Sequence, residues 1–351
     1  MLRILVTGAA GLIGGEVCAR LAARGHDITA MVRRTKEVRG NDGADVPVAS
    51  VVSGDVTLPL MELDPARHAL DLVVHCAASL QFDAPEEELE RDNVQGTANA
   101  LAFAKACGAK FAHVSTAYVC GLRQGVIEEG PVPEGTQFAN NYEASKARAE
   151  ALVAASGVPF AIARPSITLG HSETGAIRDF PSLCNVFRLM ARGKITTFPA
   201  DPNSTLDLVP IDHVAEGIAR ISERMDEAQG GYFHLVAATP TPSAELAHGV
   251  ARVPHFPDPQ IVAPADFDLA SLSPMEARVA GRMLATFGSY FTRSPRFDDR
   301  KLRALTGLTC PPTDSEWMDR LIAYGMAAGY LPAPPVSARP DSDARAAPAH
   351  P

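Results

Sequence analysis

Tyr142 and Lys146 lie four residues apart, so on a helix their side chains share one face. A free tyrosine has a pKa of about 10 and is a poor acid or base near neutrality. An adjacent ammonium and a cationic oxidised nicotinamide would favour the phenolate and lower that pKa. Tyr142 would then carry a proton while a hydride moves, and Lys146 would also bind the nicotinamide ribose. The same spacing occurs by chance on surface helices, where the tyrosine is merely half-buried.

A hydroxyl group at a predicted strand end completes the candidate catalytic set. Thr116 directly follows Lys110–Ser115, which reads as a buried strand, and its hydroxyl is suited to polarise a carbonyl oxygen. We therefore predict that Thr116, Tyr142 and Lys146 are catalytic, with Ser115 beside the cofactor.

A glycine pattern near the start of the chain predicts a dinucleotide site. Gly8, Gly11 and Gly14 have the spacing G-x-x-G-x-x-G between an apolar strand and a helix. The first permits a tight turn, the second lets the backbone approach a pyrophosphate, and the third allows close helix–strand packing. Leu12 and Ile13 lie within the same phosphate-binding turn. The alternative is a tight turn without a ligand.

The residues after the second and third predicted strands point to the kind of dinucleotide. Arg33 and Arg34 stand where an acidic residue would bind the ribose 2′-hydroxyl of NAD, and their guanidinium groups suit the 2′-phosphate of NADP. The alternative is a solvated basic loop. Asp55 and Val56 are placed to contact the adenine, although Asp55 is equally suited to a simple turn.

Strands that alternate with helices must position these groups. The pattern predicts an α/β fold with a Rossmann-type, doubly wound parallel sheet. The predicted strands are Leu2–Thr7, Asp27–Val32, Asp71–Cys76, Lys110–Ser115, Pro159–Ala163 and Tyr232–Val236, and the predicted helices are near Asn93–Cys107 and at Tyr142–Ala155, Val214–Ile221, Pro274–Phe291 and Ser315–Ala328.

The alternation loosens in the second half of the chain. We expect an NADP-binding core over residues 1–165 and a smaller substrate-covering region over residues 166–330 that is interleaved with late core elements. Pro240–Pro264 is dense in proline and is expected to be irregular. Residues 331–351 are rich in Pro, Ala, Ser, Asp and Arg, a composition typical of a disordered tail.

Composition excludes several classes of function. The net charge of −9 argues against a broad nucleic-acid surface. The six cysteines contain no Cys-x-x-Cys pair, which favours neither zinc nor disulfides and fits a reducing cytoplasm. We find no signal peptide and no apolar run long enough to span a membrane. His171 and His213 lack partners at metal-ligand spacing, so we predict no metal.

In combination, these motifs resemble the extended short-chain dehydrogenase/reductase family over nearly all of residues 1–330. The resemblance assigns catalysis to the Thr, Tyr and Lys positions already named. It also places three further segments around the cofactor and active site, namely Cys76-Ala77-Ala78, Asn93, and Pro165-Ser166 after Arg164.

A finer resemblance is to the branch of fatty acyl-CoA reductases and the thioester reductase domains of carboxylic acid reductases. Val114–Val119, Arg164–Gly175 and Leu208–Val214 carry it. It implies NADPH-dependent reduction of an acyl thioester, bound to CoA or to an acyl carrier protein, to an aldehyde or alcohol. Cys120 departs from the tyrosine of many extended members, which slightly weakens a sugar-nucleotide interpretation.

Two other functions share part of the pattern. One is an NAD(P)-dependent dehydrogenase, epimerase or dehydratase of a sugar nucleotide or sterol-like alcohol. The other is a non-catalytic NADP-binding regulator, against which the intact catalytic set argues.

Two weaker features bear on the substrate. A basic region could receive the phosphates of CoA or an acidic carrier protein, although solvated helix faces with snorkelling arginines account for it better. It comprises Arg278, Arg282, Arg293, Arg296, Arg300, Lys301 and Arg303. An apolar set could line an acyl pocket or simply form core, and it comprises Phe82, Phe180, Phe187, Met190 and Phe198.

Overall fold

In a computed structural model, which describes residues 1–35, 37–82 and 84–334, the chain is built around one seven-stranded sheet. All neighbouring strands in it are parallel, in the order β12-β7-β5-β4-β1-β2-β3. The predicted Rossmann-type sheet is therefore confirmed. The strands are β1 (Arg3–Thr7), β2 (Asp27–Val32), β3 (Ser50–Ser53), β4 (Leu72–His75), β5 (Lys110–Val114), β7 (Phe160–Pro165) and β12 (Gly231–Leu235).

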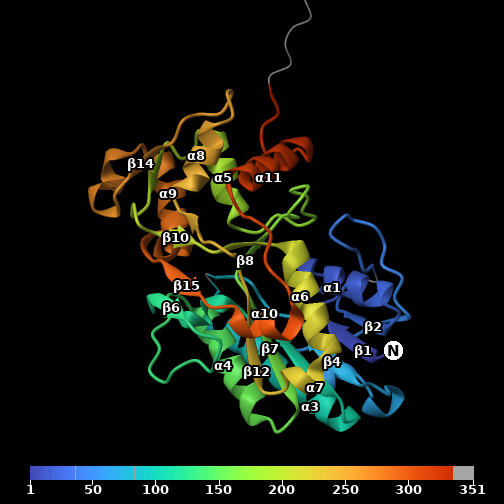
Figure 1. The fold of residues 1–351 in the computed structure, drawn as a ribbon. Coiled ribbons are helices and arrows are strands. Elements are labelled where there is room, and N and C mark those ends of the chain that lie inside the picture. The colour runs from blue at the N-terminus through green and yellow to red at the C-terminus, as the bar shows by residue number, and fades with distance from the viewer. Residues whose placement is uncertain (36, 83, 335–351) are drawn as a thin grey trace, which may run out of the picture.

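Helices cover both faces of this sheet, because the strands carry apolar side chains on each face. In β1, Ile4 and Val6 belong to one buried cluster and Leu5 to another. On the first of these faces lie α1 (Leu12–Ala23), α6 (Ile211–Glu223), α7 (Met225–Ala228) and α10 (Arg300–Thr306), and on the other lie α3 (Gly96–Cys107) and α4 (Asn141–Ala155). Figure 1 shows the first of these faces, where the helices α1 and α6 lie side by side.

The helix α4 is fixed at its start by a side-chain cap. The Asn140 carboxamide oxygen accepts a 2.9 Å hydrogen bond from the N–H of Glu143. The helix then buries residues at helical spacing, including Tyr142, Lys146 and Val153. The cap thus sets the rotation that turns the Tyr/Lys face inward.

The helix predicted near Asn93–Cys107 begins differently. A short helix, α2 (Glu86–Leu89), runs into a π-helical stretch, η3 (Glu90–Gln95), and α3 starts only at Gly96. Asn93 therefore lies on a widened turn rather than on a regular α-helix. Such π-helical turns occur often at functional sites.

A second, largely helical region stands above the carboxyl ends of the strands (Figure 1). Its core is a separate buried cluster that includes Trp317, Phe198 and Phe291. Its helices are α5 (Cys184–Ala191), α8 (Glu245–Ala251), α9 (Pro274–Phe287) and α11 (Ser315–Ala327), and four strand pairs brace it: β8 (Ile167–Leu169) with β11 (Leu208–Pro210), β9 (Thr197–Pro199) with β14 (Gln260–Val262), β10 (Thr205–Leu206) with β13 (Thr241–Pro242), and β6 (Gly125–Ile127) with β15 (Pro295–Phe297).

Three late segments differ from their predictions. Pro240–Pro264 is not irregular throughout, because α8 forms within it and buries Leu246 and Val250 in the upper core. The helix predicted to reach Phe291 ends at Phe287 and continues as a 3-10 turn. The predicted tail begins at Leu331, which is itself buried and donates to the Gly325 carbonyl at 2.9 Å. Residues 335–351 lie outside the described ones.

Candidate active site

The glycine turn after β1 has the shape that a pyrophosphate needs. Gly8 adopts a φ of +66°, and a Cβ on it would lie 2.7 Å from the Ala77 nitrogen. A Cβ on Gly14 would lie 2.3 Å from the Gly8 carbonyl oxygen. Gly11 caps α1 without offering a side-chain acceptor, so Leu12 and Ile13 open the helix with no cap from the chain itself. The turn therefore fits a dinucleotide phosphate at a helix N-terminus.

The residues predicted to hold the adenosine end lie at the ends of β2 and β3. Arg33 and Arg34 follow β2 and are exposed. The Asp55 Oδ1 atom accepts hydrogen bonds from the Thr57 N–H and hydroxyl at 2.9 and 2.8 Å. The backbone hydrogen bond from Thr57 is the main reason that the pKa of Asp55 is lowered, and the charge of Arg33 adds to it.

Val56 closes this end of the site against the helix α3. A Cβ on Gly96 would lie 3.1 Å from the Val56 Cγ2 atom, and the Asn99 amide donates to the Val56 carbonyl at 2.8 Å. Asn99 and Gly96 of α3 thus fix the segment after β3 that is predicted to meet the adenine.

The end of β4 brings Cys76, Ala77 and Ala78 against the glycine turn. The Ala77 N–H donates to the Thr7 hydroxyl at 3.3 Å, and that hydroxyl also bonds His75 Nδ1 at 2.8 Å. Burial lowers the pKa of His75 to about 3. His75 is therefore neutral and structural, as expected for a strand-end residue.

Asn93 joins this loop to the catalytic helix. Its Oδ1 atom accepts from the Ser79 N–H at 2.7 Å, and its Nδ2 atom donates to the Ser79 carbonyl at 3.2 Å and to the Ser145 hydroxyl at 3.0 Å. Ser145 lies between Tyr142 and Lys146 on α4. Asn93 thus fixes the loop after β4 relative to those two residues.

The three predicted catalytic residues come from β5 and α4. Thr116 follows β5, and its Oγ1 atom accepts from the Tyr118 N–H at 3.3 Å. Lys146 is buried and donates from Nζ to the Val114 carbonyl at 2.8 Å. Tyr142 is buried as well, and its ring packs edge-on against Phe82 with 5.0 Å between centroids.

In the structure, burial and a neighbouring carboxylate set the pKa of Tyr142, whereas the predicted lowering depends on an ammonium together with an oxidised nicotinamide. Burial raises the pKa of Tyr142, and the Glu143 carboxylate raises it further. Burial lowers the pKa of Lys146 to about 8, although Glu150 acts in the opposite direction. In this structure the phenol is therefore protonated at neutral pH, which suits a proton donor in a reduction.

Two serines border the same space. The Ser115 hydroxyl is buried and bonds to no other described atom. Ser166, after Pro165 at the end of β7, donates to the buried Asp207 Oδ1 atom at 2.5 Å. Asp207 also accepts from the Ala237 N–H at 2.8 Å, so it holds the loop after β7 in place.

A groove of about 540 Å³, within the size range of ligand sites, is lined by Phe82, which packs against Tyr142, although Tyr142 itself is not among the lining residues of the described chain. Phe82 forms part of its wall and contacts both Tyr142 and, at 6.0 Å between centroids, Phe287. Its other walls come from α5 and α9. The lining residues are Leu80, Gln81, Phe82, Ser182, Asn185, Val186, Arg188, Leu189, Val279, Arg282, Met283, Thr286 and Phe287.

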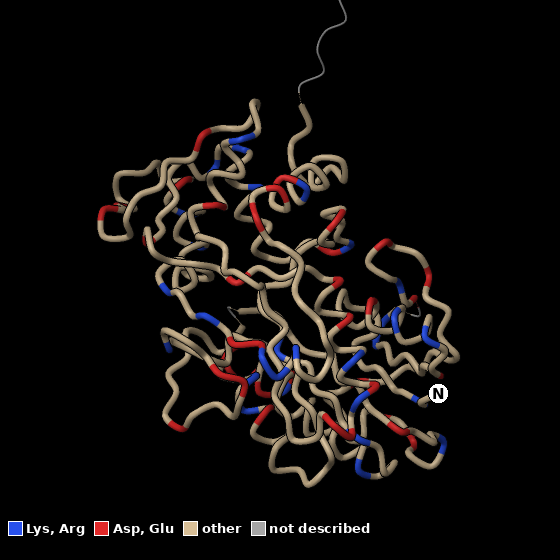
Figure 2. Tube along the Cα trace, viewed as in Figure 1, with Lys and Arg blue, Asp and Glu red and all other residues tan. Residues whose placement is uncertain are grey.

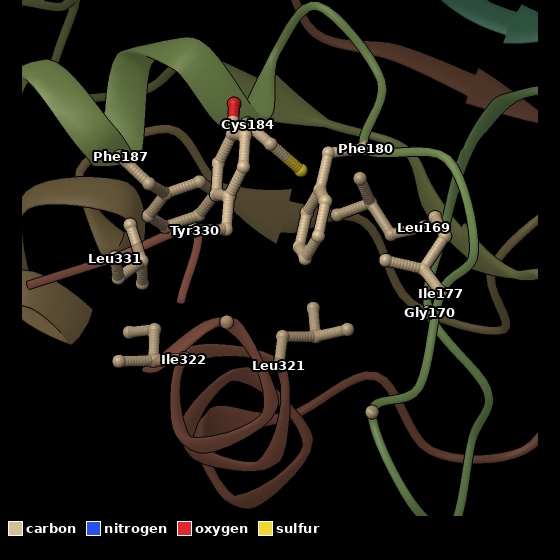
Figure 3. A pocket seen from close by; sticks show the side chains of 12 residues that line it. Leu169, Gly170, Ile177, Phe180, Cys184, Phe187, Leu321, Ile322, Tyr330 and Leu331 are labelled. Atoms are coloured by element: carbon tan, nitrogen blue, oxygen red, sulfur yellow. The ribbon is translucent and has the colours of Figure 1, made fainter. Parts of the chain in front are cut away.

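A second, apolar cavity lies on the other side of α5 (Figure 3). The figure shows the Cys184 sulfur pointing into it and Leu321 and Ile322 of α11 facing it from below. Phe180 stacks on Tyr330 with 3.9 Å between ring centroids at its edge.

These two cavities divide the predicted apolar set. Phe82 borders the groove beside Tyr142, whereas Phe180 and Phe187 line the second cavity. Met190 and Phe198 are fully buried in the upper core.

The predicted basic region does not form one patch. Arg293 is buried, and Arg300 and Arg303 pair with Asp298 and Asp299. Lys301 donates to the Glu129 carbonyl. In Figure 2, Lys and Arg are interspersed with Asp and Glu along the trace. Of the set, Arg282 alone lines the groove among the described residues.

Three side chains support the site in roles that were not predicted from the sequence. Arg293 bonds the Glu143 carboxylate next to Tyr142 at 2.5 Å. Arg178 donates to the Ala10 carbonyl in the glycine turn at 3.0 Å. Asp207 is noticeable in the sequence as a single acid between Leu206 and Leu208, but its hydrogen-bond partner Ser166 was not predictable.

Two kinds of feature are absent from the described part of the chain. There, no three His, Cys, Asp or Glu side chains are grouped so as to hold a metal ion. No helix of residues 1–35, 37–82 or 84–334 has the length and apolar character needed to cross a membrane.

Comparison with known sequences finds one family. The NAD-binding family described as "Male sterility protein" matches residues 6–218. That match includes the glycine turn and all three predicted catalytic residues.

Individual relatives are more distant. "Aldehyde reductase lnaA" of Aspergillus flavus is 27% identical over 268 residues, which cover 67% of this chain and 25% of that protein. The chain thus spans about a quarter of that relative. "3-diazoavenalumate denitrifying reductase" of a Streptomyces species is 27% identical over 331 residues, which cover 91% of this chain and 99% of that protein.

Among solved structures, the terminal R domain from the myxalamid PKS-NRPS biosynthetic pathway is similar throughout. It aligns with a TM-score of 0.80 at 26% identity and covers 95% of this chain and 93% of that one.

Proposed function

The chain belongs to the NAD-binding family described as "Male sterility protein" and is an oxidoreductase of the extended short-chain dehydrogenase/reductase type, and we propose that it reduces an acyl thioester with NADPH. The observation that carries this proposal is the position of Tyr142. Its protonated phenol lies on the same buried face of α4 as Lys146 and borders an apolar groove through Phe82.

The residues around the sheet edge support a bound dinucleotide. The glycine turn leaves room for the pyrophosphate, and Asp55 with Val56 would meet the adenine. Arg33 and Arg34 would bind the 2′-phosphate that distinguishes NADP from NAD. Cys76, Ala77 and Ala78 would border the cofactor on one side and Pro165 with Ser166 on the other. When bound, NADPH supplies the hydride.

The side chains of the chain would handle the carbonyl oxygen and its proton. Thr116 and Tyr142 would hydrogen-bond that oxygen, and Tyr142 would give it a proton as the carbon is reduced by two electrons. Lys146 would hydrogen-bond the ribose, and its ammonium would stabilise the negative charge left on Tyr142 after the proton transfer. The resulting hemithioacetal breaks its C–S bond, and the hydroxyl proton passes to sulfur, which yields an aldehyde and a free thiol.

Two observations favour a thioester over other carbonyl substrates. Phe82, Phe287 and Met283 contribute apolar surface to the groove, which suits an acyl chain or a pantetheine arm rather than a sugar. The structurally similar R domain is the terminal domain of a PKS-NRPS pathway.

The first test measures the loss of NADPH absorbance with a panel of acyl-CoA and acyl-carrier thioesters, with the products identified. We expect an aldehyde or alcohol, and the loss of turnover in Tyr142→Phe. Turnover of ketones or sugar nucleotides with no thioester reduced would refute the proposal. Full thioester turnover in Tyr142→Phe would refute the assigned mechanism.

A further inference from the structure

The groove beside Tyr142 has an apolar inner end. Phe82 packs against Tyr142 at 5.0 Å and against Phe287 at 6.0 Å, measured between ring centroids. Phe287 is the last residue of α9, so α9 runs outward from this end along the groove. The same helix lines the groove with Val279, Arg282, Met283 and Thr286, which share one face at helical spacing.

One charged lining residue, Arg282, lies away from that inner end on the same helix. Arg282 precedes Phe287 by five residues, which is about 7.5 Å along the helix axis at about 1.5 Å per residue. Arg188 enters the groove from α5, and its Nη2 atom donates to the Asn185 Oδ1 atom at 2.6 Å. Its guanidinium also lies 4.8 Å from the centre of the Tyr330 ring. These two contacts fix the position of the Arg188 guanidinium. Arg282, in contrast, is exposed to solvent.

This arrangement matches a ligand that is uncharged near Tyr142 and anionic farther out. Two guanidinium groups from separate helices bind a phosphate well, because each offers several N–H donors in a planar fork. A thioester carried on a phosphopantetheine arm has this polarity, with sulfur at one end and a phosphate at the other. CoA and acyl carrier proteins share that arm.

We propose that Arg188 and Arg282 bind the phosphate of the pantetheine arm and so place the thioester carbonyl beside Tyr142. The inference rests on the proposed thioester reduction and adds the part of the substrate that is recognised. It also gives a role to Arg282, whereas most other members of the predicted basic region are buried or paired with other groups of the chain.

The test compares three substrates with the same acyl group: acyl-CoA, acyl-phosphopantetheine and acyl-pantetheine, which lacks the phosphate. The wild-type protein is expected to show a kcat/KM about 10- to 100-fold lower for acyl-pantetheine, the range that a charged hydrogen bond supports. Arg282→Gln should lose most of the preference for the phosphate, mainly through KM. Arg188→Lys should keep part of it because the positive charge stays.

Arg278→Gln is the matched control, because Arg278 is exposed on the same helix one turn earlier and does not line the groove among the described residues. It should retain the wild-type preference. NADPH binding by each variant verifies its fold. An acyl-carrier protein assayed beside acyl-CoA then identifies which source of the arm the groove favours.

The possible failures are distinguishable. Equal kcat/KM for the phosphorylated and dephosphorylated thioesters would overturn this inference and leave thioester reduction standing. An equal loss for both substrates in Arg282→Gln would also overturn it. If none of the thioesters were reduced, the proposed function would fall, and this inference with it.

Discussion

Arg293 donates a 2.5 Å hydrogen bond to Glu143 and thereby ties the upper region to the helix that carries Tyr142. Both side chains are buried, with exposed fractions of 3% and 0%. Glu143 also accepts from the Tyr290 hydroxyl at 3.0 Å, and Arg293 donates to the Gly121 carbonyl at 2.6 Å. The first turn of α4 is therefore held by side chains of the upper region.

Replacing Arg293 with methionine should destabilise the protein strongly. The change leaves the Glu143 carboxylate buried without its cationic partner, and the removal of one member of a buried pair lowers the free energy of unfolding by about 3–5 kcal/mol. Urea denaturation followed by circular dichroism measures this difference.

Arg296→Met provides the control, since Arg296 is exposed on the neighbouring strand β15. It should change the free energy of unfolding by no more than about 0.5 kcal/mol. The double variant Arg293→Met/Glu143→Gln should recover part of the lost stability. Equal stability of Arg293→Met and Arg296→Met would contradict the role given to this pair.

The elements that carry short-range signals were predictable from the sequence. The strand Asp27–Val32 has the predicted bounds, and the polar residues that follow it mark its end. The glycine turn was predictable because its function depends on backbone conformation, which only glycine satisfies at positions such as Gly8. Tyr142 and Lys146 were predicted to share a face, and on α4 both are buried.

Contacts between distant parts of the chain were not predictable. Arg293 and Glu143 are separated by 150 residues, and Arg178 reaches Ala10 across 168. Each arginine alone looks like a solvated surface residue, because pattern reasoning sees neighbours only three or four positions away. The π-helical turn at Asn93 also left no periodic signal. For the same reason the contribution of tertiary burial, which raises the pKa of Tyr142, was not predictable from the sequence.

Gly14→Ala should abolish tight NADPH binding. The added Cβ would lie 2.3 Å from the Gly8 carbonyl oxygen, so the turn must shift away from its phosphate-binding shape. We expect the Kd for NADPH to rise by at least about 10-fold, because several backbone hydrogen bonds to phosphate depend on that shape. Nucleotide fluorescence titration measures it.

Gly281→Ala is the control for this change, because a Cβ at Gly281 in α9 meets no atom within 4 Å. It should bind NADPH normally and gain about 0.5–1 kcal/mol of stability from the better helix former. Unchanged NADPH affinity in Gly14→Ala would show that the turn does not hold the pyrophosphate.

Replacing Arg33 and Arg34 together with alanine should change the choice of cofactor. The loss of two guanidinium groups at the end of β2 should lower kcat/KM for NADPH by about 10- to 100-fold, as expected for lost charge-assisted hydrogen bonds. The kcat/KM for NADH, which has no 2′-phosphate, should change little and serves as the internal control. If kcat/KM fell equally for NADPH and NADH in the same absorbance assay, these arginines would not bind the 2′-phosphate.

Activity should decline on the alkaline side because of Lys146. Burial lowers the pKa of Lys146 to about 8, so its ammonium is present below that pH and is lost above it. The pKa of Tyr142 is raised, so the phenol stays protonated across the same range and adds no limb of its own. The kcat/KM for thioester reduction, which reports the free enzyme, should therefore fall above about pH 8. Lys146→Arg keeps a permanent charge, and although its activity is lower, its profile should lose this limb. A limb that stays near pH 8 in Lys146→Arg would assign the titration to another group.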